Sequence, residues 1–119
     1  MDATMMHEPL GTATIFAHGE HIHATSRIGL FDGEQVTWRS YAETSERARR
    51  LAAALQAAGV EANTRVATLS WNDFAHFEAY LAVPAMGAVL HTLNLRLHPD
   101  QLRYIMADAE DGVLIADAT

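Results

Sequence analysis

Short apolar segments alternate with segments of helical periodicity from residue 65 onward, and this alternation limits the possible folds more than any other feature. The apolar segments, which we expect to be strands, are residues 65–70, 88–93 and 112–117. The segments between them, 72–86 and 99–109, carry apolar residues at the spacing of a helix. Apolar strands separated by amphipathic helices predict a parallel sheet with right-handed crossovers. The expected fold class is therefore α/β, with a β-α-β-α-β unit and flanking helices.

Each of the two helices in this unit has one apolar face, which we expect to pack inward. The apolar face of the first helix comprises Phe74, Phe77, Leu81 and Ala85. That of the second helix comprises Leu102, Ile105, Met106 and Ala109. Pro99 suits the first position of the second helix, where the missing amide hydrogen has no partner to lose.

A β-hairpin is predicted before this unit. Asp32-Gly33 is a typical two-residue hairpin turn. The two strands that it joins are expected near residues 21–28 and 35–39. Residues 1–20 show no clear pattern and are expected to form an N-terminal arm, with a helical turn near residues 12–18. Residues 21–119 would then form a partial α/β subdomain.

A long helix is predicted directly after the hairpin. The segment SYAE at residues 40–43 predicts a capping box, in which Ser40 and Glu43 satisfy each other's backbone amides at the start of a helix. Gly59 suits the left-handed residue at the end of this helix. Along its exposed side we expect two ion pairs between residues four apart, Glu43 with Arg47 and Glu46 with Arg50.

The composition disfavours or excludes several classes of function. The net charge is −7 at pH 7, and an acidic surface disfavours binding to nucleic acids and anionic membranes. The chain has no cysteine, which excludes disulfides, thiolate metal sites and a cysteine nucleophile. No apolar run approaches the roughly 20 residues of a membrane-spanning helix, and the N-terminus lacks the features of a secretory signal. We therefore expect a cytoplasmic protein without a membrane span.

Asp73, His76 and Tyr80 are residue types of an acid–base site, and they fall on one side of a predicted helix. One interpretation makes His76 a general base that Asp73 orients. The other makes Asp73 a charge at the helix N-terminus, with His76 and Tyr80 beside the buried face. No nucleophile or oxyanion-hole motif lies nearby, which favours the structural interpretation.

Histidines are concentrated in the segment HGEHIH at residues 18–23. If this segment is a strand, His21 and His23 share a face and could chelate a metal ion. The chain supplies no obvious third ligand, so a solvated start of a strand is the favoured interpretation. We expect no metal site.

Asn94 and Arg96 come directly after a predicted parallel strand, whose carboxyl end is the usual place for ligands. Arg96 also precedes a helix expected to begin at Pro99, and the N-terminus of a helix can bind a phosphate. The structural alternative is that Asn94 satisfies a turn and Arg96 lies on the helix surface. These residues alone leave both interpretations open.

Several common motifs for phosphate binding or acyl transfer are absent. The sequence contains no G-x-x-x-x-G-K-[ST], no G-x-G-x-x-G and no G-x-S-x-G pattern. It also contains no lysine, because all eight of its Lys and Arg residues are arginines. A lysine-based phosphate clamp or an adenylating lysine is therefore impossible within these 119 residues.

Three segments of the chain share the residue order of one protein family. They are SYAETSERARRLAAALQAAGV, RVATLSWNDFAHFEAYLAVPAMGAVLHTLNLRL and HPDQLRYIMADAEDGVLIAD. The most specific part is the order of Trp71-Asn72, His76, Glu78, Tyr80, AVPAMGAVLHTLN and Arg96-Leu97. Together the segments resemble the N-terminal part of medium- and long-chain fatty acyl-CoA ligases, in the adenylate-forming AMP-binding superfamily. The resemblance covers residues 8–118.

The resemblance implies a parent enzyme that uses ATP and Mg²⁺ to convert a fatty acid to an acyl-adenylate and pyrophosphate, and then transfers the acyl group to coenzyme A. The phosphate loop and catalytic lysine of that family lie beyond the matched part. Residues 1–119 alone are therefore expected to be inactive and to contain no catalytic residue. The helix with His76 belongs to the scaffold in that family, which also favours its structural interpretation.

Three candidate cofactor-binding residues follow from the resemblance. Leu93, Asn94 and Arg96 match a loop that lies beside the coenzyme A nucleotide in related synthetases. The chain departs from the family at Asn63-Thr64, where Gly-Asp is usual, and at Leu95, where proline is frequent. Asn63 can take the place of a glycine at positive φ.

The resemblance and the open sheet edge both indicate partners. The N-terminal arm takes part in dimer contacts in some long-chain members, so a homodimer through residues 1–20 or through the open edge at residues 113–116 is expected. A competing interpretation is a stand-alone, non-catalytic interaction or dimerisation module. It rests on the same open edge, whose unpaired backbone groups can pair with another chain.

Overall fold

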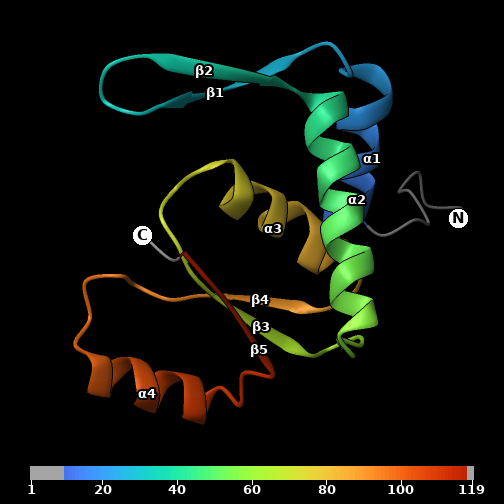
Figure 1. Cartoon of the computed structure of the whole chain (residues 1–119). Coiled ribbons are helices and arrows are strands. Elements are labelled where there is room, and N and C mark those ends of the chain that lie inside the picture. The colour runs from blue at the N-terminus through green and yellow to red at the C-terminus, as the bar shows by residue number, and fades with distance from the viewer. Residues whose placement is uncertain (1–9, 118–119) are drawn as a thin grey trace, which may run out of the picture.

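The structure is a computed structural model that describes residues 10–117 (Figure 1). Its elements in chain order are α1 (Thr12–Ile22), β1 (Arg27–Phe31), β2 (Val36–Ser40), α2 (Tyr41–Ala57), β3 (Arg65–Leu69), α3 (Phe74–Ala85), β4 (Val89–Thr92), α4 (Pro99–Asp108) and β5 (Val113–Ala116). Strands β1 and β2 form an antiparallel hairpin, and three parallel strands have the order β4-β3-β5. The predicted α/β class, with a β-hairpin followed by a β-α-β-α-β unit, is confirmed.

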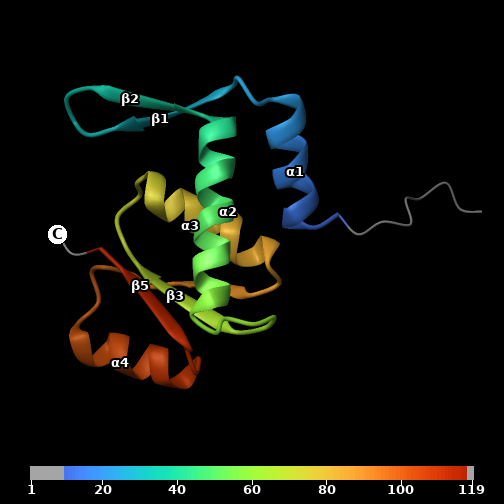
Figure 2. The same ribbon diagram turned by 45° about the vertical axis from the view of Figure 1, so that its right-hand side comes forward.

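Helices α3 and α4 cover opposite faces of the parallel sheet (Figures 1 and 2). The central strand β3 pairs with both neighbours, so that Val66 lies opposite Leu90 on one side and Val113 on the other. The chain moves from β3 to β4 in one direction and then crosses back over β3 to β5. Two right-handed crossovers in opposite directions must place their helices on opposite faces.

Helix α1 is longer than the helical turn expected from the sequence. It continues for 11 residues, and its last turn is closed by backbone hydrogen bonds. Glu20 forms an ion pair with Arg49 of α2, which holds the end of α1 against that helix. The first strand of the hairpin, expected at residues 21–28, therefore begins only at Arg27. The beginning of the expected arm, residues 1–9, lies outside the described residues.

Helix α2 begins and ends as its sequence predicts. The Ser40 hydroxyl accepts from the Glu43 amide at 3.2 Å, and the Glu43 carboxylate accepts from the Ser40 amide at 2.9 Å. These contacts hold the pKa of the Glu43 carboxyl below its usual value. At the other end Gly59 has a φ of +90°, and the Val60 amide donates to the Leu55 carbonyl, as in a Schellman motif.

Neither ion pair expected on α2 forms: Glu46 lies 3.2 Å from Arg49 instead of pairing with Arg50, and Arg47 reaches across to α3. Its Nε lies 2.6 Å from Oε1 of Glu78, an oxygen that Arg39 of β2 also contacts. The Glu78 side chain is only 5% exposed. One buried carboxylate therefore joins the hairpin, α2 and α3. Its hydrogen bond raises the pKa of Arg47.

The buried face of α3 differs from the face that its hydrophobic pattern predicts. The buried residues are His76, Glu78, Ala79, Ala82 and Val83. The expected residues Phe74, Phe77, Leu81 and Ala85 are only half-buried. Alanine side chains allow neighbouring elements to approach α3 closely, and the two polar residues are buried with hydrogen-bond partners on other elements. A pattern based on side-chain hydrophobicity misses both effects.

The hydrophobic core lies between α2, α3 and the parallel sheet. Its buried residues are Leu55, Val60, Val66, Val83 and Ala88. The other crossover helix, α4, has no buried residue. The inward face predicted for α4 is its half-buried side, so its direction is as expected. The core therefore fills one face of the sheet more completely than the other.

Candidate ligand-binding site

Two loops leave the carboxyl ends of neighbouring parallel strands and diverge. The loop after β3 leads to α3 and the loop after β4 leads to α4, and these helices cover different faces of the sheet (Figure 1). In open α/β sheets, ligands usually bind in the crevice between such diverging loops. The topology therefore indicates a ligand site between residues 70–73 and 93–98.

A pocket of about 270 Å³ lies between these loops. It is lined by Ser70, Trp71, Asn72, His76 and Tyr80 on one side and by Thr92, Leu93, Asn94, Leu95 and Arg96 on the other. Its volume is just below the roughly 300–1,000 Å³ of a typical ligand pocket, so it suits one part of a larger ligand. All three residues that the sequence nominated for a ligand-facing role lie together here.

These three residues relate to the pocket in different ways. Leu93 is buried, and its amide donates to the Thr68 carbonyl at 2.8 Å, so its side chain forms a fixed wall. The Asn94 Oδ1 accepts from the Arg96 amide at 3.0 Å. Asn94 therefore shapes the turn that presents Arg96. The Arg96 side chain itself is exposed.

No carboxylate of residues 10–117 neutralises Arg96. Ion pairs engage Arg39, Arg47, Arg49, Arg65 and Arg103. Arg27 lies over the ring of Trp38. Within the described part of the chain, only Arg50 and Arg96 have neither kind of contact. Arg96 thus presents a free guanidinium at the pocket, and this planar group with several donors is well suited to a phosphate.

The N-terminus of α4 does not supply the phosphate site considered from the sequence. His98 caps this helix, with its Nδ1 accepting from the Asp100 amide at 3.3 Å. The Gln101 side chain accepts from the His98 amide at 3.1 Å. The Asp100 carboxylate also places a negative charge in the first turn. A phosphate in this pocket would therefore be bound by the Arg96 side chain and not by the helix amides.

The contacts of Asp73 and His76 agree with the structural interpretation of this pair. Asp73 is the N-cap of α3, and its carboxylate accepts from the backbone amide of His76 at 2.7 Å. It does not hold the imidazole ring. His76 Nε2 lies 3.0 Å from the Thr68 hydroxyl, and Nδ1 is buried without a partner among residues 10–117. Neither ring nitrogen is placed to exchange a proton with a substrate.

The histidines of residues 18–23 do not lie on a strand. His21 belongs to the last turn of α1, where its Nδ1 lies 2.7 Å from the Ala17 carbonyl oxygen, and His23 caps the helix. The expected strand in this segment is therefore wrong, because helix α1 continues through residue 22 and β1 begins only at Arg27. Across residues 10–117 there is no group of three or more His, Asp or Glu side chains that could hold a metal ion.

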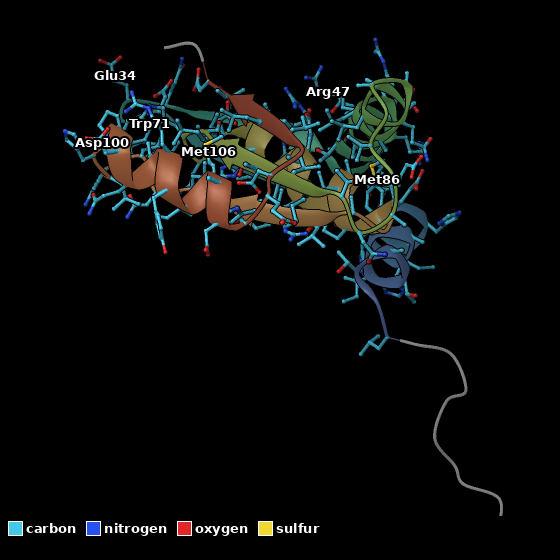
Figure 3. All side chains as sticks on the ribbon, turned by 90° about the horizontal axis from the view of Figure 1, so that it is seen from below. Glu34, Arg47, Trp71, Met86, Asp100 and Met106 are labelled. Carbon is cyan, nitrogen blue, oxygen red and sulfur yellow. The ribbon has the colours of Figure 1, made fainter. Side chains whose placement is uncertain are left out.

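Trp71 is the pocket residue that sequence reasoning missed. This residue is 59% exposed. It lies on the side of the molecule at which α4 begins, as the label of Asp100 in Figure 3 shows. The same rule that selected Asn94 and Arg96 would have found it, because Trp71 also comes directly after a parallel strand.

Comparisons with known proteins agree with this fold. The family model described as AMP-binding enzyme matches residues 17–119. A long-chain-fatty-acid–CoA ligase of Thermus thermophilus is 46% identical over 122 residues, which cover 97% of this chain and 21% of the relative. A 3-methylmercaptopropionyl-CoA ligase of Ruegeria pomeroyi is 41% identical over 116 residues, which cover 97% and 22%. The chain therefore belongs to the AMP-binding enzyme family.

A solved structure confirms the fold. The N-terminal domain of FACL13 from Mycobacterium tuberculosis matches with a TM-score of 0.84 at 22% identity, over 91% of this chain and 27% of that chain. The chain spans about a fifth of the length of the curated relatives. A match over nearly the whole chain favours the ligase interpretation over a stand-alone interaction module. No helix between residues 10 and 117 is both long and apolar enough to cross a membrane.

Proposed function

We propose that this chain is part of a fatty acyl-CoA ligase, which converts a fatty acid, ATP and coenzyme A to acyl-CoA, AMP and pyrophosphate. The acyl group would be activated as an acyl-adenylate with ATP and Mg²⁺ and then passed to the thiol of coenzyme A. Residues 1–119 would contribute one layer of the large domain and one wall of the coenzyme A site. The chain alone would be inactive.

The guanidinium of Arg96, which has no ion pair with any residue of 10–117 and lines the pocket between diverging loops, is the observation that carries this proposal. The nucleotide part of coenzyme A bears a 3′-phosphate, for which a guanidinium is a well-matched partner. Ser70 and Asn72 add polar groups to the same pocket. The residues present therefore fit a nucleotide phosphate, with Asn94 holding the turn of Arg96 and Leu93 forming the wall.

The ATP site would be built by residues outside this chain. A triphosphate is usually bound by a glycine-rich loop and a lysine, and the sequence has neither a P-loop nor any lysine. The acyl site is also expected elsewhere. The long-chain relative supports a fatty acid as the substrate, yet the 3-methylmercaptopropionyl relative matches the same share of this chain. The matched part therefore carries little information on the acyl group.

The first test asks whether the natural gene product is longer than this chain. An antibody against residues 1–119 should detect, in denatured cell extract, a species several times heavier than 13.0 kDa. Residues 1–119 alone should show no ATP–pyrophosphate exchange with any fatty acid. A single 13.0 kDa species, or exchange by the short chain, would contradict the proposal. Immunodetection in fractionated cells would test the expected cytoplasmic location.

The second test concerns the coenzyme A side of the site. Adenosine 3′,5′-bisphosphate, the nucleotide part of coenzyme A, should bind to the chain in calorimetry. Arg96→Ala should weaken this binding by about tenfold or more, because a charge-assisted hydrogen bond is lost. Arg50→Ala is the matched control, since Arg50 also lacks an ion pair in the described part of the chain but lies outside this pocket. Equal effects of the two variants would contradict a specific site.

We also propose a homodimer, formed through the N-terminal arm or through the open edge of β5. Helix α1 supports the first route because it has no buried residue and exposes Ile15 and Ile22. The position of β5 at the end of the sheet supports the second. Sedimentation velocity should detect a dimer, and Ile15→Ser with Ile22→Ser should dissociate it if the arm is used. A monomer at high micromolar concentration would contradict both routes.

A further inference from the structure

We propose that Trp71 is a stacking surface for the purine base of the nucleotide whose phosphate Arg96 binds. This inference rests on the proposed function, because it places the base of that nucleotide in the same pocket. It adds a contact for the adenine base to the contact already proposed between Arg96 and the phosphate. It also assigns a binding role to a residue that the fold does not need for its core.

Trp71 and Arg96 line one pocket from the two diverging loops. A base and a phosphate of one nucleotide require an aromatic surface and a positive charge within the same small site, and the pocket supplies both. Its volume of about 270 Å³ suits a base with part of its sugar. Base–aromatic stacking needs an accessible aromatic residue, and Trp71 is 59% exposed.

The backbone of Trp71 is held in a fixed turn. Its carbonyl accepts from the Asp73 amide at 3.0 Å and from the Ser70 hydroxyl at 3.2 Å. Asp73 in turn caps α3. The indole therefore projects from a short segment anchored to β3 on one side and to a helix N-terminus on the other. A surface that is ordered before binding loses less entropy on binding.

Tyr80 provides a second aromatic ring in the pocket, and buried residues hold it in place. Its ring centroid lies 5.1 Å from that of His76, at a tilt of 54°. His76 is in turn fixed by the Thr68 hydroxyl at 3.0 Å. The His76 side chain, considered from the sequence as a general base, thus supports one wall of the pocket.

The other tryptophan of the chain, Trp38, is a natural control. It is similarly exposed, at 55%, but its ring already has Arg27 over it at 5.2 Å. It also lies on the hairpin and does not line the pocket. With only two tryptophans in the sequence, Trp38→Phe leaves Trp71 as the single tryptophan and Trp71→Phe leaves Trp38.

The test uses the whole chain and adenosine 3′,5′-bisphosphate as the probe. In Trp38→Phe, the probe should quench tryptophan fluorescence in a saturable manner, whereas in Trp71→Phe it should not. Calorimetry should show that Trp71→Ala weakens probe binding by about tenfold, with Trp71→Phe retaining most of the affinity because phenylalanine also stacks. Trp38→Phe should bind as tightly as the unchanged chain. Circular dichroism checks that each variant is folded.

Two further probes separate the base from the phosphate. Adenosine should lose affinity in Trp71→Ala but not in Arg96→Ala, and inorganic phosphate should show the opposite dependence. If the bisphosphate binds in an Arg96-dependent manner while Trp71→Ala changes nothing, the stacking proposal is overturned and the nucleotide site stands. If the unchanged chain binds no bisphosphate, the nucleotide site itself is overturned and the stacking role with it.

Discussion

Helices α3 and α4 are the two crossovers of one sheet, yet they are packed very differently. Helix α3 buries five of its residues, whereas α4 buries none. Helix α3 lies above the sheet with α1 and α2 beside it and the hairpin above it, while α4 lies alone below the sheet (Figures 1 and 2). One face of the sheet is therefore covered by a complete layer, and the other by a single helix.

The polar contacts of the two helices show the same difference. Glu78 of α3 is buried and binds arginines from two other elements. The ion pair of α4, between Asp100 and Arg103, joins two exposed side chains of one helix. Removing one partner of a buried ion pair is strongly destabilising, whereas removing one partner of an exposed local pair costs little. We therefore expect mutations around α3 to lower the global free energy of unfolding, and mutations in α4 to destabilise only that helix.

The largest effect should come from Glu78→Ala. It removes the carboxylate but leaves Arg39 and Arg47, whose side chains are 25% and 50% exposed and so partly solvated. We expect a loss of about 3 kcal/mol in the free energy of unfolding, at the lower end for breaking a buried pair. Urea denaturation would measure it. Asp100→Ala, the matched variant in α4, should lower the free energy of unfolding by about 0.5 kcal/mol or less. Equal losses in the two variants would contradict the expected difference between the buried and the exposed ion pair.

A second pair of variants compares the N-caps of the two helices. Asp73→Ala should destabilise the chain by about 1–2 kcal/mol, because it leaves the His76 amide of a buried helix without its acceptor. His98→Ala removes the cap of α4 and should leave the global stability nearly unchanged. Native-state hydrogen exchange would distinguish global from local destabilisation. In His98→Ala, faster exchange should be confined to α4. Faster exchange throughout the chain in His98→Ala would argue against a locally unfolding α4.

The contrast between the two helices also explains what the sequence could and could not predict. Helix α4 has its apolar residues at regular spacing and a proline at its start, so its extent and inward face followed from local rules. The inward face of α3 did not, because Glu78 is buried only through arginines 31 and 39 residues away. Side-chain hydrophobicity contains no information on such partners.

The same limit applies to the candidate site and to the start of the chain. Asn94 and Arg96 could be nominated because they follow a strand, and the structure brings them together with Leu93 in one pocket. That Arg96 has no carboxylate partner within residues 10–117 depends on the three-dimensional positions of the acidic residues in that range. The extent of α1 was underestimated for a similar reason, because Glu20 is anchored by Arg49 of α2.

The start of α2, the helix that covers α3, offers an effect of intermediate size. Ser40→Ala should cost about 1 kcal/mol through loss of the helix cap. Hydrogen bonds from the Ser40 amide and hydroxyl lower the pKa of Glu43 from its usual 4.5. The carboxylate therefore stabilises the folded state above that value, and this contribution is lost as the pH falls through the lowered pKa. Glu43→Gln should be more destabilising at pH 7 than at pH 3 in urea denaturation, and a pH-independent difference would contradict this assignment.

The smallest effect should come from Tyr104→Ser on the outer side of α4. Tyr104 is 69% exposed, and substitutions at such positions usually change stability by less than about 0.5 kcal/mol. The position chosen for comparison in α3 is Val83, which is fully buried. Val83→Ala should lower the free energy of unfolding by about 2 kcal/mol. If Tyr104→Ser were destabilising only at high protein concentration, a second copy must cover α4 in solution. Urea denaturation at two concentrations distinguishes an open outer face of α4 from one that is covered on association.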